Sequence, residues 1–594
     1  MVMNLLGTCR IICKLLSVLI SLCLTGCRIC DRSCSKSGLF LRQSSETHVL
    51  WPTEGSPTKR AEHFLELANS LSDADDARSV DYYFNAATLS WALLSDRAEF
   101  ATPHHPSWDV YQTSLQGLVT NAVRFGRFDG CGNLNIYQPH GPILVPVTSS
   151  SLDWPIEQLR QFQIPLDPEQ RKLKRYFKKS GLGVPIVAFR IKPAGHEVDP
   201  LERYLPEQHP LASTLILRSA DSSSLVDHSE HSSEESNQFV IELVDPLKVN
   251  AIEIQSQPIP IAKDLSAPLD YQLRNRPTNP FLGFVAPGTG SQNDGLRWVD
   301  PYQPGKIPVV FIHGLVSEPT TWLDMLNELR TIPWFNDRYQ VWGFSYATGS
   351  PFVTSAMRLR EQCQEAISLV DPHGEDPALR EMVMIGHSMG GLLAKLQITD
   401  SQDRLWNSIS KTPLQSIRAT PDAKRELEKR LFFTPQPHVK RVIYIATPHQ
   451  GASIASRGTG RFFSAFVHPD EQVRTFHDRL VHDNPNVFYG TFRKRIPTSI
   501  DLLEPSDNTL QSIYDLPVPY NVCQHLIIGT GEGPWNLGLN DGVVPVSSAR
   551  HRCADTEIQV KASHTKILKH EETISEVIRL LHLHLTEVES QNWP

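Results

Sequence analysis

The feature that most constrains the fold is GHSMG at residues 386–390. It follows an apolar run, EMVMI, and precedes GLLAKLQI, in which apolar residues recur at helical spacing. A strand that turns sharply into a helix strains the backbone of its middle residue, and side chains two residues to either side would clash. Glycine at both flanks removes that clash. The hydroxyl group of Ser388 is then presented at the carboxyl edge of a sheet, so the pattern indicates a nucleophile.

The surrounding pattern predicts an α/β domain from residue 305 to residue 594. Runs that are apolar on both faces alternate there with helical patterns, which is typical of a doubly wound, mostly parallel sheet. The expected strands are KIPVVFIHG, YQVWGFSY, EMVMIGH, VKRVIYIAT, QHLIIGT and EIQVKAS, and the expected helices cover residues 320–329, 355–368, 572–585 and a stretch from residue 390. Ser345, in GFSYA, lacks the second glycine and a following helix, so it is interpreted as a loop residue.

A serine hydroxyl group needs a base to remove its proton and an acid to orient that base. In a fold of this type both follow later strands, so Asp541, in LNDGVVP after QHLIIGT, is the expected acid. Glu532 lies nearer the end of the same strand and is the alternative acid. The last strand leads directly into His564, which is the expected base, and His570 is the alternative.

Attack on a carbonyl group develops negative charge on its oxygen, which two fixed backbone N–H groups commonly stabilise. The amide of Met389 directly follows the nucleophile. The second donor is expected from the loop after an earlier strand, FIHGLVSEPTTW, where Leu315 follows the end of the strand. We therefore expect an oxyanion hole formed by Leu315 and Met389, and we expect His313 to shape the loop through local hydrogen bonds.

Five segments, VVFIHGL, GHSMGG, IATPHQGAS, DGVVP and ASH, resemble in that order the motifs of the α/β-hydrolase superfamily. The similarity is specifically to its lipase-like esterases and to the inositol deacylases that trim GPI anchors. It implies hydrolysis of carboxylic esters through an acyl-enzyme, with Ser388, Asp541 and His564 at the triad positions. It also implies the oxyanion positions Leu315 and Met389, and neither a metal nor a cofactor.

The resemblance covers about half of the chain, from residue 305 onward, and is incomplete at one position. Many relatives have glycine before the catalytic histidine, where this chain has Ser563, which weakens His564 against His570. Residues 453–516 occupy the place in which lipase-like enzymes carry a cap.

The N-terminus has the pattern of an export signal. Two basic residues precede the apolar run LLSVLISLCL at residues 15–24, which is too short to span a bilayer comfortably. The run ends in LTGC, which resembles the lipobox of bacterial lipoproteins and makes Cys27 the expected site of lipidation. We expect residues 1–27 to be a lipoprotein signal peptide and residues 28–59 to be a tether. The resemblance implies an exported protein anchored at the outer membrane, or at the cell surface or periplasm, of a bacterium.

Two further regions lie between the tether and the α/β domain. Residues 60–152 are expected to form a helical segment that begins with a pair of helices ending near residue 96. Residues 153–290 contain the strand-like runs VPIVAFRI, STLILRSA, FVIELVD and VNAIEIQ, and are expected to form a β-rich accessory module. The sequence does not indicate the role of either region.

Composition excludes some partners and leaves other questions open. The net charge of −8 gives no general attraction to phosphate, and no Lys and Arg cluster is interleaved with aromatic residues, so nucleic acid is not an expected partner. An exported protein could pair Cys523 with Cys553, and the spacing leaves this open.

The function that the sequence favours is that of a membrane-anchored serine hydrolase acting on carboxylic esters, with a lipid or a lipid-like molecule as substrate. One alternative is an acyltransferase that uses the same acyl-enzyme. Another is a surface binding or scaffold protein that carries an inert hydrolase domain.

Overall fold

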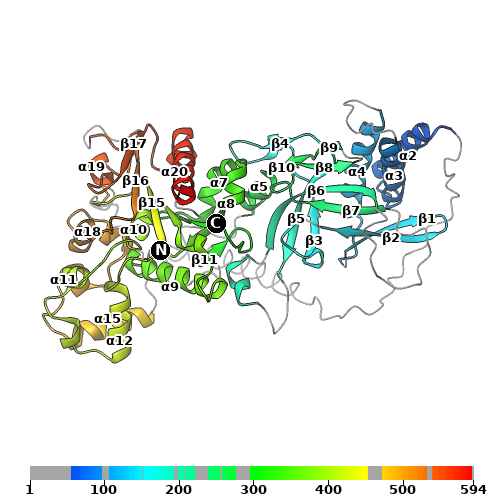
Figure 1. Cartoon of the computed structure of the whole chain (residues 1–594). Helices are drawn as coiled ribbons and strands as arrows, with labels where there is room; N and C mark the ends of the chain where they lie inside the picture. The colour runs from blue at the N-terminus through cyan, green and yellow to red at the C-terminus, as the bar shows by residue number, and fades with distance from the viewer. Residues whose placement is uncertain are drawn as a thin grey trace, which may run out of the picture. The chain divides into compact units, whose positions relative to one another are not determined.

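The structure of this protein is a computed structural model that describes residues 55–96, 106–130, 132–149, 151–192, 199–206, 208–220, 239–254, 257–275, 294–452, 471–531 and 538–590 (Figure 1). Four predictions from the sequence concern residues outside this set. They are the signal peptide with Cys27, most of the tether (residues 28–54), the alternative acid Glu532, and the first part of the expected cap, residues 453–470.

The C-terminal half contains a seven-stranded sheet with the strand order β11-β13-β12-β14-β15-β16-β17. Its strands are β11 (Gly295–Trp298), β12 (Ile307–Ile312), β13 (Tyr339–Ser345), β14 (Met382–His387), β15 (Val439–Ile445), β16 (Cys523–Gly529) and β17 (Thr556–Val560). Every neighbouring pair is parallel except β11 with β13. The chain is thus mixed α/β with the mostly parallel sheet expected from its sequence. The antiparallel strand β11 precedes residue 305, where we placed the start of the domain.

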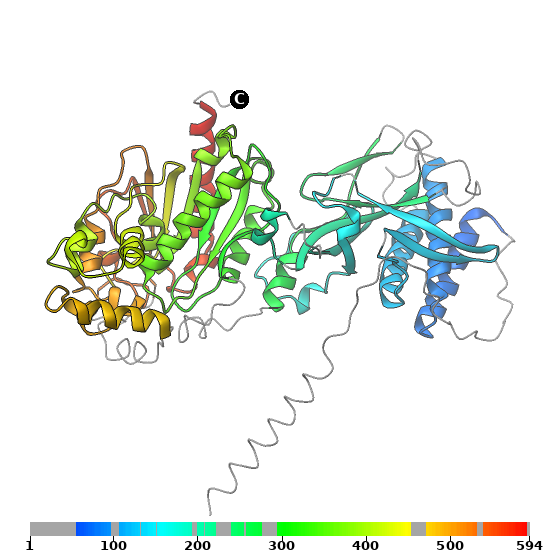
Figure 2. The ribbon, with the colours of Figure 1, turned by 90° about the horizontal axis from the view of Figure 1, so that it is seen from below.

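Helices cover both faces of this sheet. α7 (Leu323–Leu329) and α20 (Glu571–Ser590) share one buried cluster with alternate residues of β12. α9 (Phe352–Val370) and α10 (Met389–Lys395) contact each other, and α10 contacts β12, β14 and β15 from the other face (Figures 1 and 2). Strands covered on both faces have no polar side, and all residues of β12 and β14 are accordingly buried.

The connections of β12 create the place where a site is expected. The chain runs from β12 to β13 on one side and then crosses to β14 on the other side of β12. Ile312 at the end of β12 pairs with Gly386 near the end of β14, so the two carboxyl ends lie level. In open α/β sheets, ligands bind at such a switch point, outside the carboxyl ends of the strands.

Two helical excursions interrupt the alternation of strands and helices. The first lies between α10 and β15 and contains α11 (Arg404–Ile409) and the charged helix α12 (Pro421–Leu431). The second lies between β15 and β16 and contains α15 (Glu471–Asp483), α16 (Gly490–Lys494), α17 (Ser499–Leu502) and α18 (Asn508–Tyr514). The second excursion occupies the stretch in which the sequence predicted a cap, and α18 contacts α11.

The N-terminal half combines three helices with a second sheet. The helices are α2 (Pro57–Asp73), α3 (Ser79–Asp96) and α4 (Pro106–Arg124). The six-stranded sheet has the order β1-β2-β7-β6-β5-β3 and consists of β1 (Asn133–Gln138), β2 (Gly141–Thr148), β3 (Leu159–Gln163), β5 (Val184–Ile191), β6 (Gln208–Ser219) and β7 (Phe239–Val244). Short strands form two further pairs, β4 (Lys178–Lys179) with β10 (Lys263–Asp264) and β8 (Ala251–Ile254) with β9 (Gln257–Pro260). The hairpin β1–β2 lies within residues 60–152, which we expected to be helical.

Residues upstream of the seven-stranded sheet contribute to its core. Leu173, together with Leu269 and Leu273 of α5 (Ala267–Arg274), is buried in the cluster that also contains residues of α7, β12 and α20.

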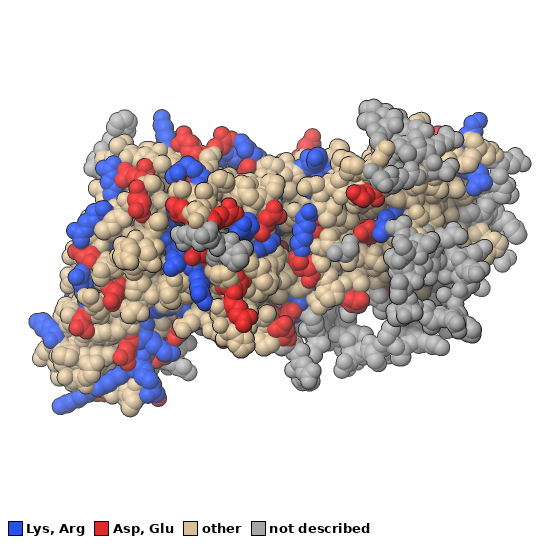
Figure 3. Space-filling model, in the orientation of Figure 1, with Lys and Arg blue, Asp and Glu red and all other residues tan. Residues whose placement is uncertain are grey.

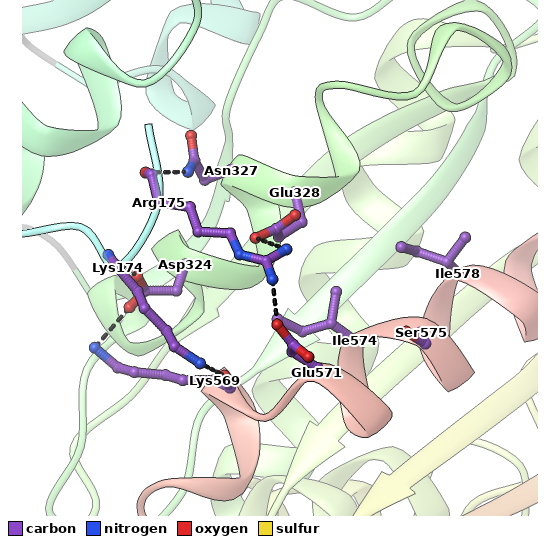
Figure 4. A pocket seen from close by; sticks show the side chains of 10 residues that line it. All are labelled: Lys174, Arg175, Asp324, Asn327, Glu328, Lys569, Glu571, Ile574, Ser575 and Ile578. Carbon is purple, nitrogen blue, oxygen red and sulfur yellow. Dashed lines mark hydrogen bonds and ion pairs between the residues drawn. The ribbon is translucent and has the colours of Figure 1, made fainter. Parts of the chain in front are cut away.

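Polar contacts accompany this packing around a pocket shown in Figure 4. Asp324 of α7 accepts a hydrogen bond from the backbone N–H of Lys174 at 2.9 Å and pairs with Lys569 at 2.6 Å. Asn327 donates to the carbonyl oxygen of Arg175 at 3.0 Å. Asp324 and Asn327 are buried, at 7% and 1% exposure. The backbone groups of Lys174 and Arg175 therefore provide hydrogen-bond partners for side chains that water does not reach.

Candidate active site

Ser388 occupies a strained turn between β14 and α10, with φ of 53° and ψ of −125°. Positive φ is unusual for a residue other than glycine. A Cβ atom on Gly386 would lie 2.5 Å from the backbone of Gly391, and one on Gly390 would lie 2.3 Å from the carbonyl oxygen of Ile312. Both distances are shorter than any real contact, so the turn requires glycine on each side of the serine.

Ser388, His564 and Asp541 form a continuous chain of hydrogen bonds. The Oγ of Ser388 lies 2.9 Å from Nε2 of His564, and Nδ1 of His564 lies 2.6 Å from Oδ2 of Asp541. A carboxylate only accepts hydrogen bonds, so Nδ1 of the imidazole carries a proton and Nε2 is free to accept one from the serine. The three residues are 7%, 9% and 2% exposed, so the chain of bonds is largely shielded from water.

The loop that carries the carboxylate is itself fixed. Oδ1 of Asp541 accepts hydrogen bonds from the backbone N–H groups of Val543 at 2.9 Å and Val544 at 2.7 Å. The carbonyl oxygen of Asp541 accepts the backbone N–H of His564 at 2.9 Å. Asp541 thus forms hydrogen bonds with both the ring and the backbone of His564. Because the other carboxylate oxygen is also held, Oδ2 has one orientation toward Nδ1.

The two expected oxyanion donors belong to different elements. Met389 is the first residue of α10 and directly follows Ser388. Leu315 follows Gly314, where an added Cβ atom would lie 2.9 Å from the Cβ of Ser388. Within the described residues, neither amide donates a hydrogen bond to another group. Two N–H groups beside the hydroxyl are therefore available to an anion.

His313 forms local contacts beside this loop. Its Nδ1 lies 3.0 Å from the carbonyl oxygen of Gly314, and its ring stacks on Tyr346 at 4.5 Å. The hydroxyl of Tyr346 in turn donates to the carbonyl oxygen of His313 at 2.8 Å. Burial lowers the pKa of His313 to about 4, so the ring is neutral near pH 7. These contacts fix the backbone that leads into Leu315.

The remaining sequence alternatives lie elsewhere or outside the described residues. Nδ1 of His570 accepts the backbone N–H of Glu572 at 3.3 Å, at the start of α20. Ser345 is the last residue of β13 and pairs with β11, so it lies in a strand and not in the loop that we expected. Cys523 and Cys553 are both free thiols.

Two buried residues, one in contact with His564 and one at the end of α10, were not predicted from the sequence. Nε2 of His387 lies 3.0 Å from the carbonyl oxygen of His564. Lys395, at the end of α10, is fully buried and contacts His551 and Tyr514. A sequence signal existed only for the lysine, which interrupts the apolar run GLLAKL. The role of His387 depends on a partner 177 residues away.

Among the described residues, no helix is both long and apolar enough to cross a membrane. The same residues contain no group of three or more His, Cys, Asp or Glu side chains that could hold a metal ion. The arrangement of Ser388, His564 and Asp541 can activate the serine hydroxyl group.

No protein-family model matches this sequence, and no curated protein matches it either. Among solved structures, the mature form of a Bacillus licheniformis lipase aligns with 49% of this chain and 99% of its own, at 19% identity and a TM-score of 0.30. Esterase B of Lactobacillus rhamnosis aligns with 55% of this chain and 96% of its own, at 12% identity and a TM-score of 0.27. A phospholipase of Legionella pneumophila aligns with 41% of this chain and 46% of its own, at 16% identity and a TM-score of 0.25. Because these scores and identities are low, function is inferred from the geometry of the site itself.

Proposed function

We propose that this protein is a serine hydrolase that cleaves carboxylic esters through an acyl-enzyme. The observation that carries the proposal is the hydrogen-bonded chain from Ser388 through His564 to Asp541, at the switch point of a mostly parallel sheet. The strained backbone of Ser388 supports it further, because strain of this kind persists where the surrounding structure maintains it for function.

In the proposed reaction, Nε2 of His564 removes the hydroxyl proton as Oγ of Ser388 attacks the ester carbonyl carbon. The imidazolium that forms is stabilised by the carboxylate of Asp541. His564 then gives its proton to the leaving alkoxide as the ester bond breaks, which leaves an acyl group on the serine. A water molecule, deprotonated by the same nitrogen, attacks the acyl-enzyme. As the bond from the acyl group to Oγ breaks, His564 returns the proton to Oγ of Ser388, and the carboxylic acid is released.

The amides of Leu315 and Met389 are the proposed donors to the oxyanion in both steps. Each donor of this kind contributes roughly 2.7–4 kcal/mol to the stabilisation of a transition state. The contribution is large because the donors are fixed before the reaction starts. The stacked pair His313 and Tyr346 supports this part of the proposal, since it fixes the loop before Leu315.

We further propose that the substrate is a lipid or a lipid-like ester and that the protein is exported and anchored through a lipid on Cys27. The motif resemblance and the LTGC sequence at residues 24–27 support these two points. On the face in Figure 3, Lys and Arg side chains are interspersed with Asp and Glu, which fits a partner other than nucleic acid.

A fluorophosphonate probe tests the proposed nucleophile, because it forms a covalent bond with an activated serine. We expect the full chain to be labelled and Ser388→Ala to be unlabelled. Ser345→Ala is the matched control, since Ser345 is the last residue of β13 in the same sheet, and it should be labelled like the wild type. A folded wild type that resists the probe would overturn the proposal and favour a binding protein with an inert hydrolase domain.

Product analysis tests the acceptor of the acyl group. We expect free carboxylic acid as the main product of a short-chain ester, even when an alcohol is added. Quantitative transfer to the alcohol, with hydrolysis suppressed, would instead identify an acyltransferase.

Incorporation of radiolabelled palmitate in a bacterial host tests the anchor. The wild type should take up label, and Cys27→Ala should not. Cys30→Ala provides the control, because it removes a neighbouring cysteine and should leave labelling unchanged. Equal labelling of the Cys27 variant would contradict lipidation at this residue.

A further inference from the structure

His387 directly precedes the nucleophile, yet its side chain bonds to the histidine of the triad. It ends β14, is 5% exposed, and its Nε2 lies 3.0 Å from the carbonyl oxygen of His564. The two imidazole rings are 4.9 Å apart and inclined at 40°. The residue before Ser388 thus contacts the backbone of the residue that takes the serine proton.

The hydrogen-bond partner of His387 determines which of its two ring nitrogens carries the proton. A carbonyl oxygen only accepts hydrogen bonds, so Nε2 carries the proton and donates it. Burial, followed in size by the charge of His564, lowers the pKa of His387 to about 3. The ring therefore stays neutral, with Nδ1 unprotonated, over the pH range in which esterases are assayed.

This bond completes the fixation of the proposed base. The backbone N–H of His564 donates to the carbonyl oxygen of Asp541 at 2.9 Å, and its carbonyl oxygen accepts from His387. The peptide groups on both sides of its Cα atom are thereby held, one by the acid loop and one by the nucleophile strand. Among the four hydrogen bonds that fix His564 in the described structure, the bond from His387 is the one that ties its backbone to β14.

The other nitrogen of the same ring faces the third loop of the site. An added Cβ atom on Gly314 would lie 3.0 Å from Nδ1 of His387 and 2.9 Å from Cβ of Ser388. Nδ1 is buried and has no hydrogen-bond partner among the described residues. The edge of Trp322 also contacts the ring, with centroids 6.4 Å apart. The imidazole therefore fills the space between the oxyanion loop, the nucleophile strand and the base.

We propose that His387 is a positioning residue: by donating Nε2–H to the carbonyl oxygen of His564, it keeps the base within reach of Ser388. It takes no part in proton transfer. The inference rests on the proposed hydrolase function and concerns how the same site is held together. Since a displacement of about 1 Å in a catalytic group can cost on the order of 10²-fold in rate, one hydrogen bond at this point has a large effect.

Replacement of His387 by Leu and by Gln, in the full chain, tests the proposal. Leu keeps the burial and removes the donor, so we expect kcat to fall about 10- to 100-fold with KM within about threefold of the wild type. The rate of fluorophosphonate labelling should fall by the same factor. Gln supplies an amide N–H donor, and His387→Gln should regain most of the lost kcat.

His584 provides a matched control. It is 3% exposed, and its Nε2 lies 2.8 Å from a backbone carbonyl oxygen, that of Glu381, away from the triad. His584→Leu removes the same kind of bond at the same depth of burial, so it should lower the unfolding temperature and leave kcat of the folded fraction unchanged.

The outcomes separate this proposal from the proposed function. A wild type without labelling or ester hydrolysis would overturn the function itself. An active wild type with kcat of His387→Leu within twofold of it would overturn the positioning role alone. Equal losses of kcat in His387→Leu and His584→Leu would likewise overturn it, since a general loss of stability would then explain both.

Discussion

At the scale of single residues, Asp541 supports the sharpest prediction. Its carboxylate accepts from Nδ1 of His564 and from two backbone amides, so it fixes both the tautomer of the imidazole and the rotation of its ring. Asp541→Asn keeps the shape but offers an amide group, which removes the negative charge that stabilises the imidazolium. We expect kcat to fall by about 10⁴-fold.

The measurement is ester hydrolysis at neutral pH, with circular dichroism to establish that the variant is folded. Asn540→Asp makes a suitable control, because it alters the neighbouring residue of the same loop and leaves Asp541 in place. Turnover of Asp541→Asn within a few-fold of the wild type would move the acid role to another residue, with Glu532 the first to test.

How far residues can be predicted from sequence depends on what determines them. Ser388, Asp541 and His564 were predicted to lie together because each follows a strand of a parallel sheet, where position along the chain predicts position in space, and the structure joins them by hydrogen bonds. His387 lies within GHSMG and Lys395 ends the helix that follows it, but the partners of both lie on other loops. No local pattern encodes a contact of that kind, and the geometry of the fold is needed to find it.

At the scale of elements, α10 ends in a titratable group that is unusual because it is buried. Lys395 ends this helix with no exposed surface, and its Nζ lies 3.0 Å from the carbonyl oxygen of Tyr514 and 2.9 Å from Nε2 of His551. Burial lowers the pKa of Lys395 to about 7; weaker contributions come from Cys553 and Asp515, which raise it, and from Arg552, which lowers it. The folded protein therefore holds a largely neutral amine above pH 7.

The effect of Lys395 on stability depends on how many protons its amine binds in the folded and in the unfolded chain. Between pH 7 and the ordinary lysine value of 10.5, the unfolded chain binds a proton that the folded chain lacks. The contribution of Lys395 to stability therefore rises with pH across this window, by up to about 1.4 kcal/mol per pH unit. Lys395→Met removes this dependence, so its stability relative to the wild type should decrease as the pH rises.

Urea unfolding of both proteins at pH 7.5 and pH 9.5 measures this difference. We expect the free energy of unfolding of Lys395→Met, relative to the wild type, to drop by about 2–3 kcal/mol between the two pH values. Other titrating groups are common to both proteins and cancel. A relative stability that is the same at both pH values would show that the buried amine is protonated throughout.

The helices and strands differ in how clearly the sequence pattern predicts them. The parallel strands were found from runs that are apolar on both faces, a pattern that burial between two helical layers requires. β11 has only four residues and pairs with one neighbour, so its pattern is too short to detect. The hairpin β1–β2 was missed because its strands are only half-buried: Leu134 and Ile136 of β1 and Val145 and Val147 of β2 are the buried residues of the pair.

At the scale of the whole molecule, the domain boundary expected at residue 305 does not coincide with the boundary of the core. Leu173, Leu269 and Leu273 are 3%, 1% and 5% exposed and share their buried cluster with Phe311 and Trp322 beneath the site. Each fully buried leucine contributes roughly 1.5–3 kcal/mol. The catalytic half is thus stabilised by residues from the region that sequence patterns assigned to a separate module.

This packing predicts that a change in α5 affects the catalytic half directly. Leu269→Ala should leave a cavity that costs about 2–5 kcal/mol, and the temperature at which Ser388 loses its reactivity toward a fluorophosphonate should fall by several degrees. Leu118→Ala is the matched control, because Leu118 is completely buried in α4 and lies outside this cluster. It should lower the stability of the N-terminal helices with a smaller effect on labelling. If Leu269→Ala and the wild type lose labelling at the same temperature, the catalytic half unfolds independently of α5, and residue 305 is a sound place to divide the chain.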